Sequence, residues 1–170
     1  CTDATAGANI WKAGEDGSIT PFIAATGGDI STYGDYKIHT FASSANFTIS
    51  NPGISPNNVI DYLVVAGGGS GGFSYGGGGG AGGLVHKTNN TVTATTYAIV
   101  IGGGAAANIS SASSGNVGND TTFAYSGTIT AKGGGGGGSE NRDASSGGSG
   151  GGSGHEAAGN GSGTQTSESG

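Results

Sequence analysis

Runs of glycine constrain this chain more than any other feature of its sequence. Residues 67–83 read GGGSGGFSYGGGGGAGG, and residues 133–138 are six consecutive glycines. Each glycine in a helix interior costs about 1 kcal/mol relative to alanine, and glycine has no side chain to bury. The runs are therefore either disordered or packed through their backbone alone.

The segments that precede the runs favour an ordered structure. Residues 59–72, 91–104 and 128–138 each begin with β-branched residues, joined by a tyrosine in the first two segments, and end in glycine. Charged residues make up only 9% of the chain, whereas disordered chains usually carry many charges and few residues of the strand-forming kind. We therefore expect the glycine runs to continue from strands.

Glycine can form extended helices with three residues per turn, and rods of this type can approach until their backbone N–H and C=O groups pair. We expect the runs that begin at residues 67 and 133 to pack in this way, as polyglycine II helices. The Gly/Ser-rich residues 159–170 instead fit a flexible tail.

Hydrophobic alternation predicts the strands. Residues 36–50 are expected to form a hairpin, and Val59–Ala66 is apolar enough for a central strand that is buried on both faces. Leu84–Val85 predicts a brief extended return, and Thr91–Ile101 a long strand. Residues 121–125 and 128–131 predict a second hairpin, which turns at Ser126–Gly127.

These elements predict an all-β fold with glycine-rich loops that pack as polyglycine II helices, and the family resemblance given below implies that the fold is an antiparallel β-sandwich. We expect an N-terminal connecting arm at residues 1–33, a glycine-rich β domain at 34–158 and a Gly/Ser-rich tail at 159–170. The chain contains no methionine, which indicates a processed form or a piece of a longer protein. Cys1 is then either an internal residue of that protein or a lipid-modified N-terminal cysteine.

Charge and hydropathy argue against two classes of partner. The net charge is −6 and the five cations are scattered singly, so no basic patch exists for nucleic acid. No stretch approaches the roughly 20 apolar residues of a membrane span.

Two apparent catalytic motifs lack the context that their chemistry needs. Residues 67–72 satisfy G-x-G-x-x-G, but no helix can follow to present its N-terminus to a pyrophosphate. The pattern G-x-S-x-G at Ser70, Ser74 and Ser149 lacks the strand-to-helix turn of a nucleophile elbow. The histidines are far apart and unaccompanied by cysteine, so no zinc spacing exists. We expect no enzymatic activity, no cofactor and no metal.

Short insertions between the glycine runs carry the candidate recognition residues. If the runs are rigid rods, these insertions are turns at rod ends, where aromatic and polar side chains suit the recognition of carbohydrate or protein. The alternative is that they are ordinary loop residues, and some of the acidic and histidine side chains could instead meet around a cation. The candidates are Phe73, Tyr75, Glu140, Asn141, Arg142, Asp143, His155 and Glu156.

An ordered set of segments resembles a known family. The segments are ATGGDISTYGDYKIHTFASSANFTIS, VIDYLVVAGGGSGG, GGGGGAGGLV, TYAIVIGGG and TITAKGGGGGG, within residues 25–138. They resemble the glycine-rich domain of bacteriophage tail fibres and related virion structural and adhesive proteins, with a match that continues to about Gly154. The resemblance implies a β-sandwich-like scaffold from which glycine segments project and pack.

The expected function is a non-enzymatic structural and adhesive module of a phage tail fibre or similar extracellular fibre. Such a module assembles with copies of itself or with other fibre subunits, and its loops contact a host surface glycan or protein. The alternative is a subunit of a bacterial extracellular filament or surface layer, anchored through Cys1 or joined to its neighbours by residues 1–33. A third hypothesis, ice binding by a flat polyglycine face, would require regular rows of threonine or alanine.

Overall fold

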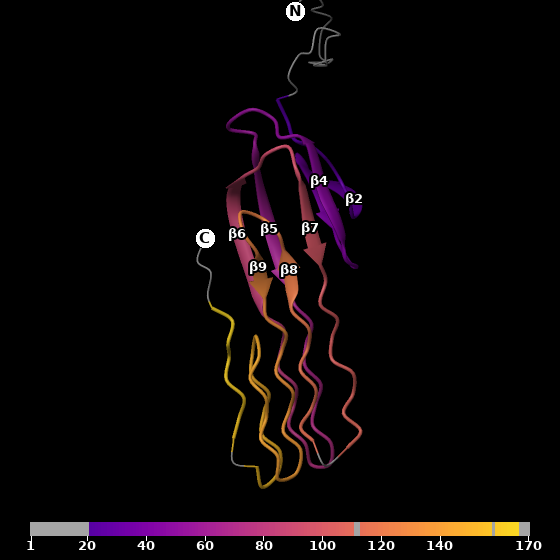
Figure 1. Ribbon diagram of the computed structural model, residues 1–170, viewed down its shortest axis with the longest axis vertical. Helices are drawn as coiled ribbons and strands as arrows, with labels where there is room; N and C mark the ends of the chain where they lie inside the picture. The colour runs from indigo at the N-terminus through magenta and orange to yellow at the C-terminus, as the bar shows by residue number, and fades with distance from the viewer. Residues whose placement is uncertain (1–20, 111–112, 158, 167–170) are drawn as a thin grey trace, which may run out of the picture.

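The computed structural model describes residues 21–110, 113–157 and 159–166. Within these residues the chain is all-β and has no helix, so no helix could cross a membrane there. Strands occupy one end of an elongated molecule, and glycine-rich segments extend from them to the other end (Figure 1). The strands are β1 (Ala24–Thr26), β2 (Asp29–Tyr33), β3 (Tyr36–Thr40), β4 (Ala45–Asn51), β5 (Val59–Val65), β6 (Leu84–Thr91), β7 (Thr96–Val100), β8 (Thr121–Phe123) and β9 (Ile129–Ala131).

The strands form two sheets that face each other, and a separate hairpin. The larger sheet has the order β1-β4-β7-β8-β9, β5 pairs with β6, and β2 pairs with β3. All of these pairs are antiparallel. Because β5 and β6 contact β8 and β9, the two sheets pack as the layers of a sandwich. The predicted all-β, antiparallel fold class is confirmed.

Aromatic rings fill much of the space between the two sheets. Tyr62 of β5 packs against Phe123 of β8, with ring centroids 5.3 Å apart, and Tyr97 and Tyr125 lie beside them. Aliphatic side chains from both sheets complete this core. The buried hydrophobic residues are Phe47, Ile49, Val64, Ala66, Val85, Val92, Tyr97, Phe123 and Ala131.

The predicted hairpin at residues 36–50 is wrong in its pairing. β3 pairs with β2 through a two-residue loop, whose Gly34 has a φ of 57° that suits a tight hairpin turn. β4 pairs instead with β1 and β7. The physical reason is burial, because β4 places Phe47 and Ile49 in the core whereas β3 is almost entirely exposed.

β5 is buried on one face only, which corrects the expectation of a central strand. Val64 is buried, but the side chains on either side of it, Leu63 and Val65, are 60% and 51% exposed. β5 belongs to a two-stranded sheet and only its inner face is covered by β8 and β9. An apolar run therefore did not distinguish a strand with two covered faces from a strand with one.

The long strand predicted at residues 91–101 is divided. β6 extends from Leu84 to Thr91, β7 starts at Thr96, and residues 92–95 connect them. β-Branched residues continue through this connection, so strand propensity gave no sign of the reversal. The other predicted hairpin is confirmed, since β8 pairs with β9 and the turn residues Ser126 and Gly127 have positive φ.

The regular pairing starts earlier than the predicted domain boundary at residue 34. β1 and β2 both lie within the segment that was expected to be a connecting arm. Residues 1–20 of that arm, with Cys1, lie outside the described residues.

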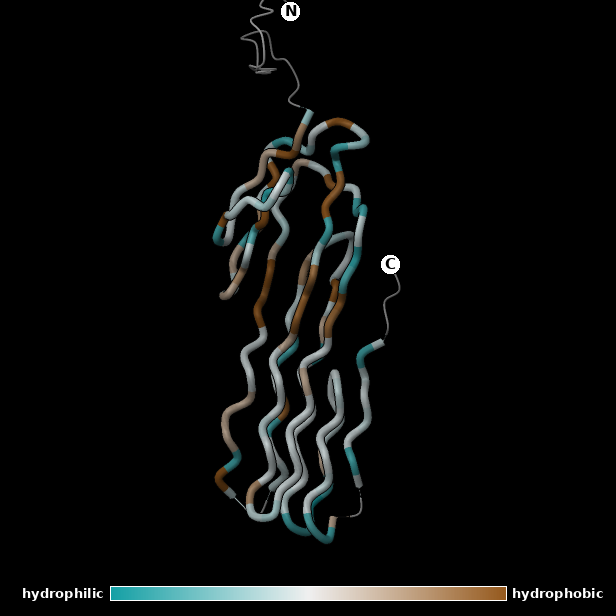
Figure 2. Tube along the Cα trace, turned by 180° about the vertical axis from the view of Figure 1, so that it is seen from behind, coloured by the Kyte–Doolittle hydropathy of each residue, from teal (hydrophilic) through white to brown (hydrophobic). Residues whose placement is uncertain are grey.

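Beyond the strands, extended segments lie side by side and form what we call the glycine bundle. β5, β7 and β9 each continue directly into it, in the predicted order of strand and then glycine run. Hydrophobic residues are concentrated in the strands, and the bundle is close to neutral in hydropathy (Figure 2). The runs of the bundle are 67–72, 76–82, 102–106, 115–119, 133–138, 145–148, 149–154 and 160–164.

Run 133–138 lies at the centre of the bundle, and all of its residues are buried. Its backbone hydrogen bonds repeat every three residues. Gly134 and Gly137 donate to Gly67 and Ser70, at 2.8 and 2.9 Å. Gly135 and Gly138 donate in another direction, to run 149–154. The carbonyl groups of the run accept hydrogen bonds from runs 76–82, 115–119 and 145–148.

A period of three means that residues three apart face the same neighbouring run, as they would in a helix with three residues per turn. The assignment of the runs to polyglycine II helices itself stays a prediction. At many of the contacts between runs the approach is too close for a side chain. A Cβ atom added at Gly136 would lie 1.8 Å from the carbonyl oxygen of Gly115, and one at Gly72 would lie 1.9 Å from that of Gly138.

Residues 159–166 differ from the expected flexible tail. Gly161 donates to Gly151, Gly147 donates to Ser162 and Thr164 donates to Gly147, so this segment forms a further run of the bundle. Glycine at 161 lets the backbone pack closely, because an added Cβ there would lie 1.9 Å from the oxygen of Ser145. Residues 167–170 lie outside the described residues.

Candidate functional site

The glycine bundle ends in a group of turns at the pole opposite the strands (Figure 1). We call the turns 73–75, 139–143 and 155–157 the tip. Backbone hydrogen bonds join them: Glu140 donates to Ser74 at 3.1 Å, His155 donates to Tyr75 at 3.0 Å, and Asn141 donates to His155 at 3.0 Å. Candidate residues that are distant in sequence are thus brought together in one place.

The tip turns have an unusual choice of residues. Ser74, Tyr75, Asn141 and Glu156 all have φ between 48° and 56°, in the left-handed region. This conformation costs roughly 1–2 kcal/mol for a residue with a Cβ atom, and glycine adopts it at no steric cost. Four of the six described non-glycine residues with positive φ are at the tip, and the other two are Asn89 and Ser126.

Tyr75 is the most prominent aromatic residue of the tip. Its side chain is 77% exposed, and its ring packs beside that of His155 with the centroids 5.7 Å apart. Phe73 in the same turn is also exposed. An aromatic ring held at the end of a rigid bundle offers an open face for a ligand.

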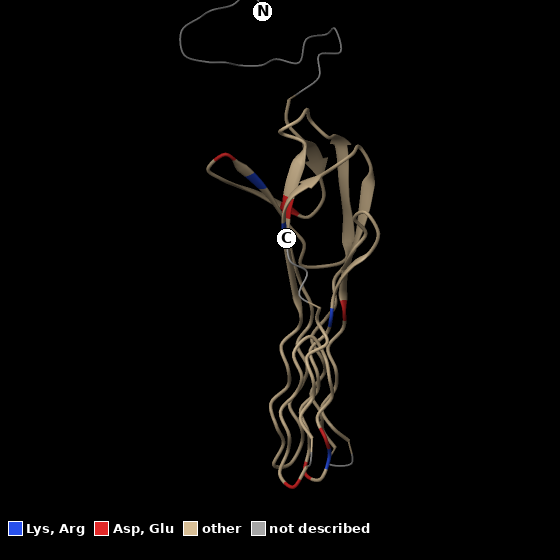
Figure 3. Ribbon diagram, turned by 90° about the vertical axis from the view of Figure 1, so that its left-hand side faces the viewer, with Lys and Arg blue, Asp and Glu red and all other residues tan. Residues whose placement is uncertain are grey.

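Charged residues also gather at this end of the molecule (Figure 3). Glu140 accepts a long hydrogen bond of 3.5 Å from the hydroxyl of Ser74. Arg142 and Glu156 are exposed. Glu140, Asp143 and Glu156 against Arg142 give three negative charges and one positive, a formal sum of −2 with His155 neutral.

Asp143 has a structural role at the tip. One of its carboxylate oxygens accepts the N–H of Gly159 at 2.8 Å, and its main-chain carbonyl accepts the hydroxyl of Ser114. In the part of the chain that the structure describes, no three His, Cys, Asp or Glu side chains form a group that could hold a metal ion. The cation site considered for Glu140, Asp143, His155 and Glu156 is therefore not formed.

Ser139 fixes the tip to the bundle, a role that the sequence analysis did not predict. Its side chain is fully buried. The hydroxyl accepts the N–H of Phe73 at 2.9 Å and donates to the carbonyl of Ser113 at 2.7 Å. The amide of Asn108 also lies 3.3 Å from the hydroxyl. This contact places Asn108 and the strongly exposed Ile109 near the tip. In the sequence, the one feature that could have pointed to this segment is an apolar residue, Ile109, within a polar loop.

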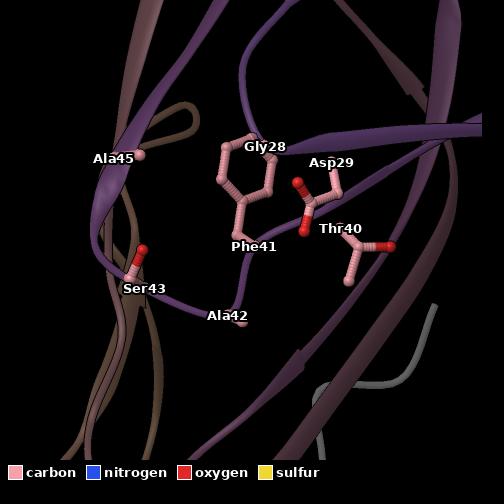
Figure 4. A pocket seen from close by; sticks show the side chains of 7 residues that line it. All are labelled: Gly28, Asp29, Thr40, Phe41, Ala42, Ser43 and Ala45. Atoms are coloured by element: carbon pink, nitrogen blue, oxygen red, sulfur yellow. The ribbon is translucent and has the colours of Figure 1, made fainter.

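A small hollow lies far from the tip, between β2, β3 and the start of β4 (Figure 4). Its volume is about 100 Å³, and ligand pockets usually measure roughly 300–1,000 Å³. This hollow is too small for a drug-sized ligand. It is lined by Gly28, Asp29, Thr40, Phe41, Ala42, Ser43 and Ala45.

The fold and the tip define an elongated antiparallel β protein that carries its exposed turns on a glycine bundle. Residues 41–170 match the family model described as the glycine-rich domain, and the chain belongs to that family. Neither a curated protein nor a solved structure matches the chain.

Proposed function

We propose that this chain is a non-enzymatic structural and adhesive module of a phage tail fibre or a similar extracellular fibre. In this role the strands form the base, polyglycine II rods form a rigid stalk, and the tip contacts a host surface. The observation that carries the proposal is that four of the six described non-glycine residues with positive φ gather at the tip, beside exposed aromatic and charged residues.

The direction of the chain is consistent with this role. The segments at both ends of the described chain lead away from the tip, and the tip is made of internal turns only (Figure 1). A partner joined at the strand end would therefore leave the tip free to reach a surface.

Assembly with copies of itself is part of the proposal. Leu63, Val65 and Leu84 form an exposed apolar patch on the outer face of β5 and β6. The runs that continue from these strands, 67–72 and 76–82, contain no charged residue. Two copies, each with a net charge of −6, could meet on this apolar patch and these uncharged runs, with Asp61 of β5 at the edge of the contact.

The experiment is to measure binding of the labelled chain to a panel of bacterial cells. We expect binding to at least one strain, and we expect a variant with Tyr75→Ala and Arg142→Ala together to lose most of it. Tyr33→Ala is the matched control, because Tyr33 is 78% exposed at the other end of the molecule. Equal binding by the tip variant and the control, or no binding to any cell, would contradict the adhesive role.

A bacterial filament subunit is the second candidate, and the hairpin of β2 and β3 favours it. This hairpin stands away from the sandwich (Figure 3) and exposes Tyr33, Tyr36 and Ile38 on one face. Two-stranded hairpins are marginally stable alone, so a neighbouring subunit would stabilise it. Electron microscopy of the purified chain would show long filaments if this role is correct, and discrete particles if it is not.

A further inference from the structure

We infer that the tip binds carbohydrate, specifically neutral hexopyranose units, with the exposed ring of Tyr75 as the stacking platform. This inference rests on the proposed adhesive function and names the ligand class of the same site. A pyranose ring has one face lined by C–H groups and a rim of hydroxyl groups. It therefore fits a site with one open aromatic face and several short-range donors and acceptors.

The size of the tip favours a sugar over a protein. Within the described residues, the turns 73–75, 139–143 and 155–157 contain 3, 5 and 3 residues, and Asn108 and Ile109 beside them bring the number to 13. A standard protein interface uses about 20–30 residues on each side and buries about 800 Å² per partner. The tip is well short of that, whereas a single sugar unit needs only one ring face and a few hydrogen bonds.

Tyr75 is held in place before any ligand arrives. Its backbone φ is 49°, its carbonyl accepts the N–H of His155, and its ring lies against the imidazole at an interplanar angle of 46°. The turn is further tied to the bundle through the bond from Phe73 to Ser139. A fixed aromatic residue loses little conformational entropy on binding, which favours a small ligand with a small contact area.

The polar groups around Tyr75 match the hydrogen-bonding needs of hydroxyl groups. The carboxylates of Glu140 and Glu156 accept, and the Asn141 amide and the Arg142 guanidinium donate. Sugar hydroxyls do both. Asn141, Arg142 and Glu156 are exposed, so their polar groups are accessible to a ligand at the tip.

Electrostatics distinguishes between classes of sugar. The tip has a formal sum of −2 and the whole chain of −6. Anionic sugars, such as uronic acids and sialic acids, would be repelled by both. Neutral hexopyranoses avoid this repulsion and keep the contacts with the aromatic face and the hydroxyl rim.

The test uses the full chain, displayed in several copies on streptavidin, on an array of neutral and acidic oligosaccharides. We expect the chain to bind neutral hexopyranosides on the array. We expect Tyr75→Ala to bind them at least about tenfold more weakly, which corresponds to a loss of about 1.4 kcal/mol or more in binding free energy. Tyr75→Phe keeps the ring and should retain binding, as should Tyr33→Ala. The thermal unfolding of each variant shows whether the chain remains folded, and Tyr75→Gly relieves the positive φ if Tyr75→Ala fails to fold.

Binding to acidic glycans only, no array signal, or full retention by Tyr75→Ala would overturn the inference. Binding to cells treated with periodate or with protease distinguishes the failure of this inference from the failure of the proposed function. Periodate cleaves the diols of sugars. If periodate treatment leaves cell binding intact and protease treatment abolishes it, the ligand is a protein. In that case the carbohydrate inference is wrong and the adhesive role stands. If untreated cells bind nothing while the array is positive, the adhesive role fails and the carbohydrate site stands.

Discussion

Asp120 links a strand end to the start of the central glycine run. Its carboxylate accepts the ammonium group of Lys132 at 2.8 Å and the N–H of Gly133 at 2.8 Å. The hydrogen bond from Lys132, followed by the hydrogen bond from Gly133, holds the pKa of Asp120 below its ordinary value of 3.8, and desolvation by burial acts in the opposite direction. A single carboxylate therefore closes the junction between β8, β9 and the bundle.

The depressed pKa predicts how stability depends on pH. Because the folded state holds the proton less tightly than the unfolded state, the contribution of Asp120 is fully present above pH 3.8 and is lost as the pH falls through the lower, folded-state pKa. The pair is exposed, so we expect Asp120→Asn to cost no more than about 1 kcal/mol at neutral pH. Urea unfolding of the native chain and of Asp120→Asn across the acid range should show this difference shrinking as the pH falls. A cost for Asp120→Asn that stays constant into acid would contradict the mechanism.

At the scale of the element, the glycine run differs from the strand in what determines its sequence. A strand needs apolar side chains on one face, and several residue types satisfy that need. A buried run needs the absence of a side chain at each contact, and only glycine satisfies that. At Gly103, by contrast, an added Cβ would meet no atom within 4 Å.

This difference predicts opposite effects for two substitutions of the same kind. Gly136→Ala places a Cβ 1.8 Å from the oxygen of Gly115, so runs 115–119 and 133–138 must separate. We expect Gly136→Ala to lower the free energy of unfolding by about 1–3 kcal/mol or more. Gly103→Ala should be neutral or stabilising by up to about 1 kcal/mol, because alanine lowers the entropy of the unfolded chain. Chemical denaturation would measure both, and equal effects would show that the runs are not tightly packed.

At the scale of the whole molecule, two kinds of packing are joined end to end. The sandwich is held by apolar contacts among residues such as Ile49, Val85 and Phe123. The bundle is held by hydrogen bonds between backbone groups and contains few apolar side chains. The runs continue from the strands without a linker, so each part fixes the ends of the other.

This composition predicts an unusual heat capacity of unfolding. Exposure of apolar surface raises the heat capacity and exposure of polar surface lowers it, and typical proteins give about 12–15 cal/mol/K per residue. Because the bundle buries mainly peptide groups, we expect a value clearly below this range. Differential scanning calorimetry at several pH values would provide it. A value within the usual range would mean that apolar burial dominates the whole molecule.

The sequence by itself determined the all-β class, the order of strand and glycine run, and the turn at Ser126–Gly127, because these depend on local preferences of neighbouring residues. It also located the candidate residues of the tip, since non-glycine insertions stand out between glycine runs. Only the tertiary structure decided that β3 pairs with β2 and that β5 has one open face. It also decided that residues 159–166 join the bundle and that Ser139 anchors the tip. These features depend on contacts between segments far apart in the chain, and glycine, which has no side chain, carries no signal of which neighbour it will meet.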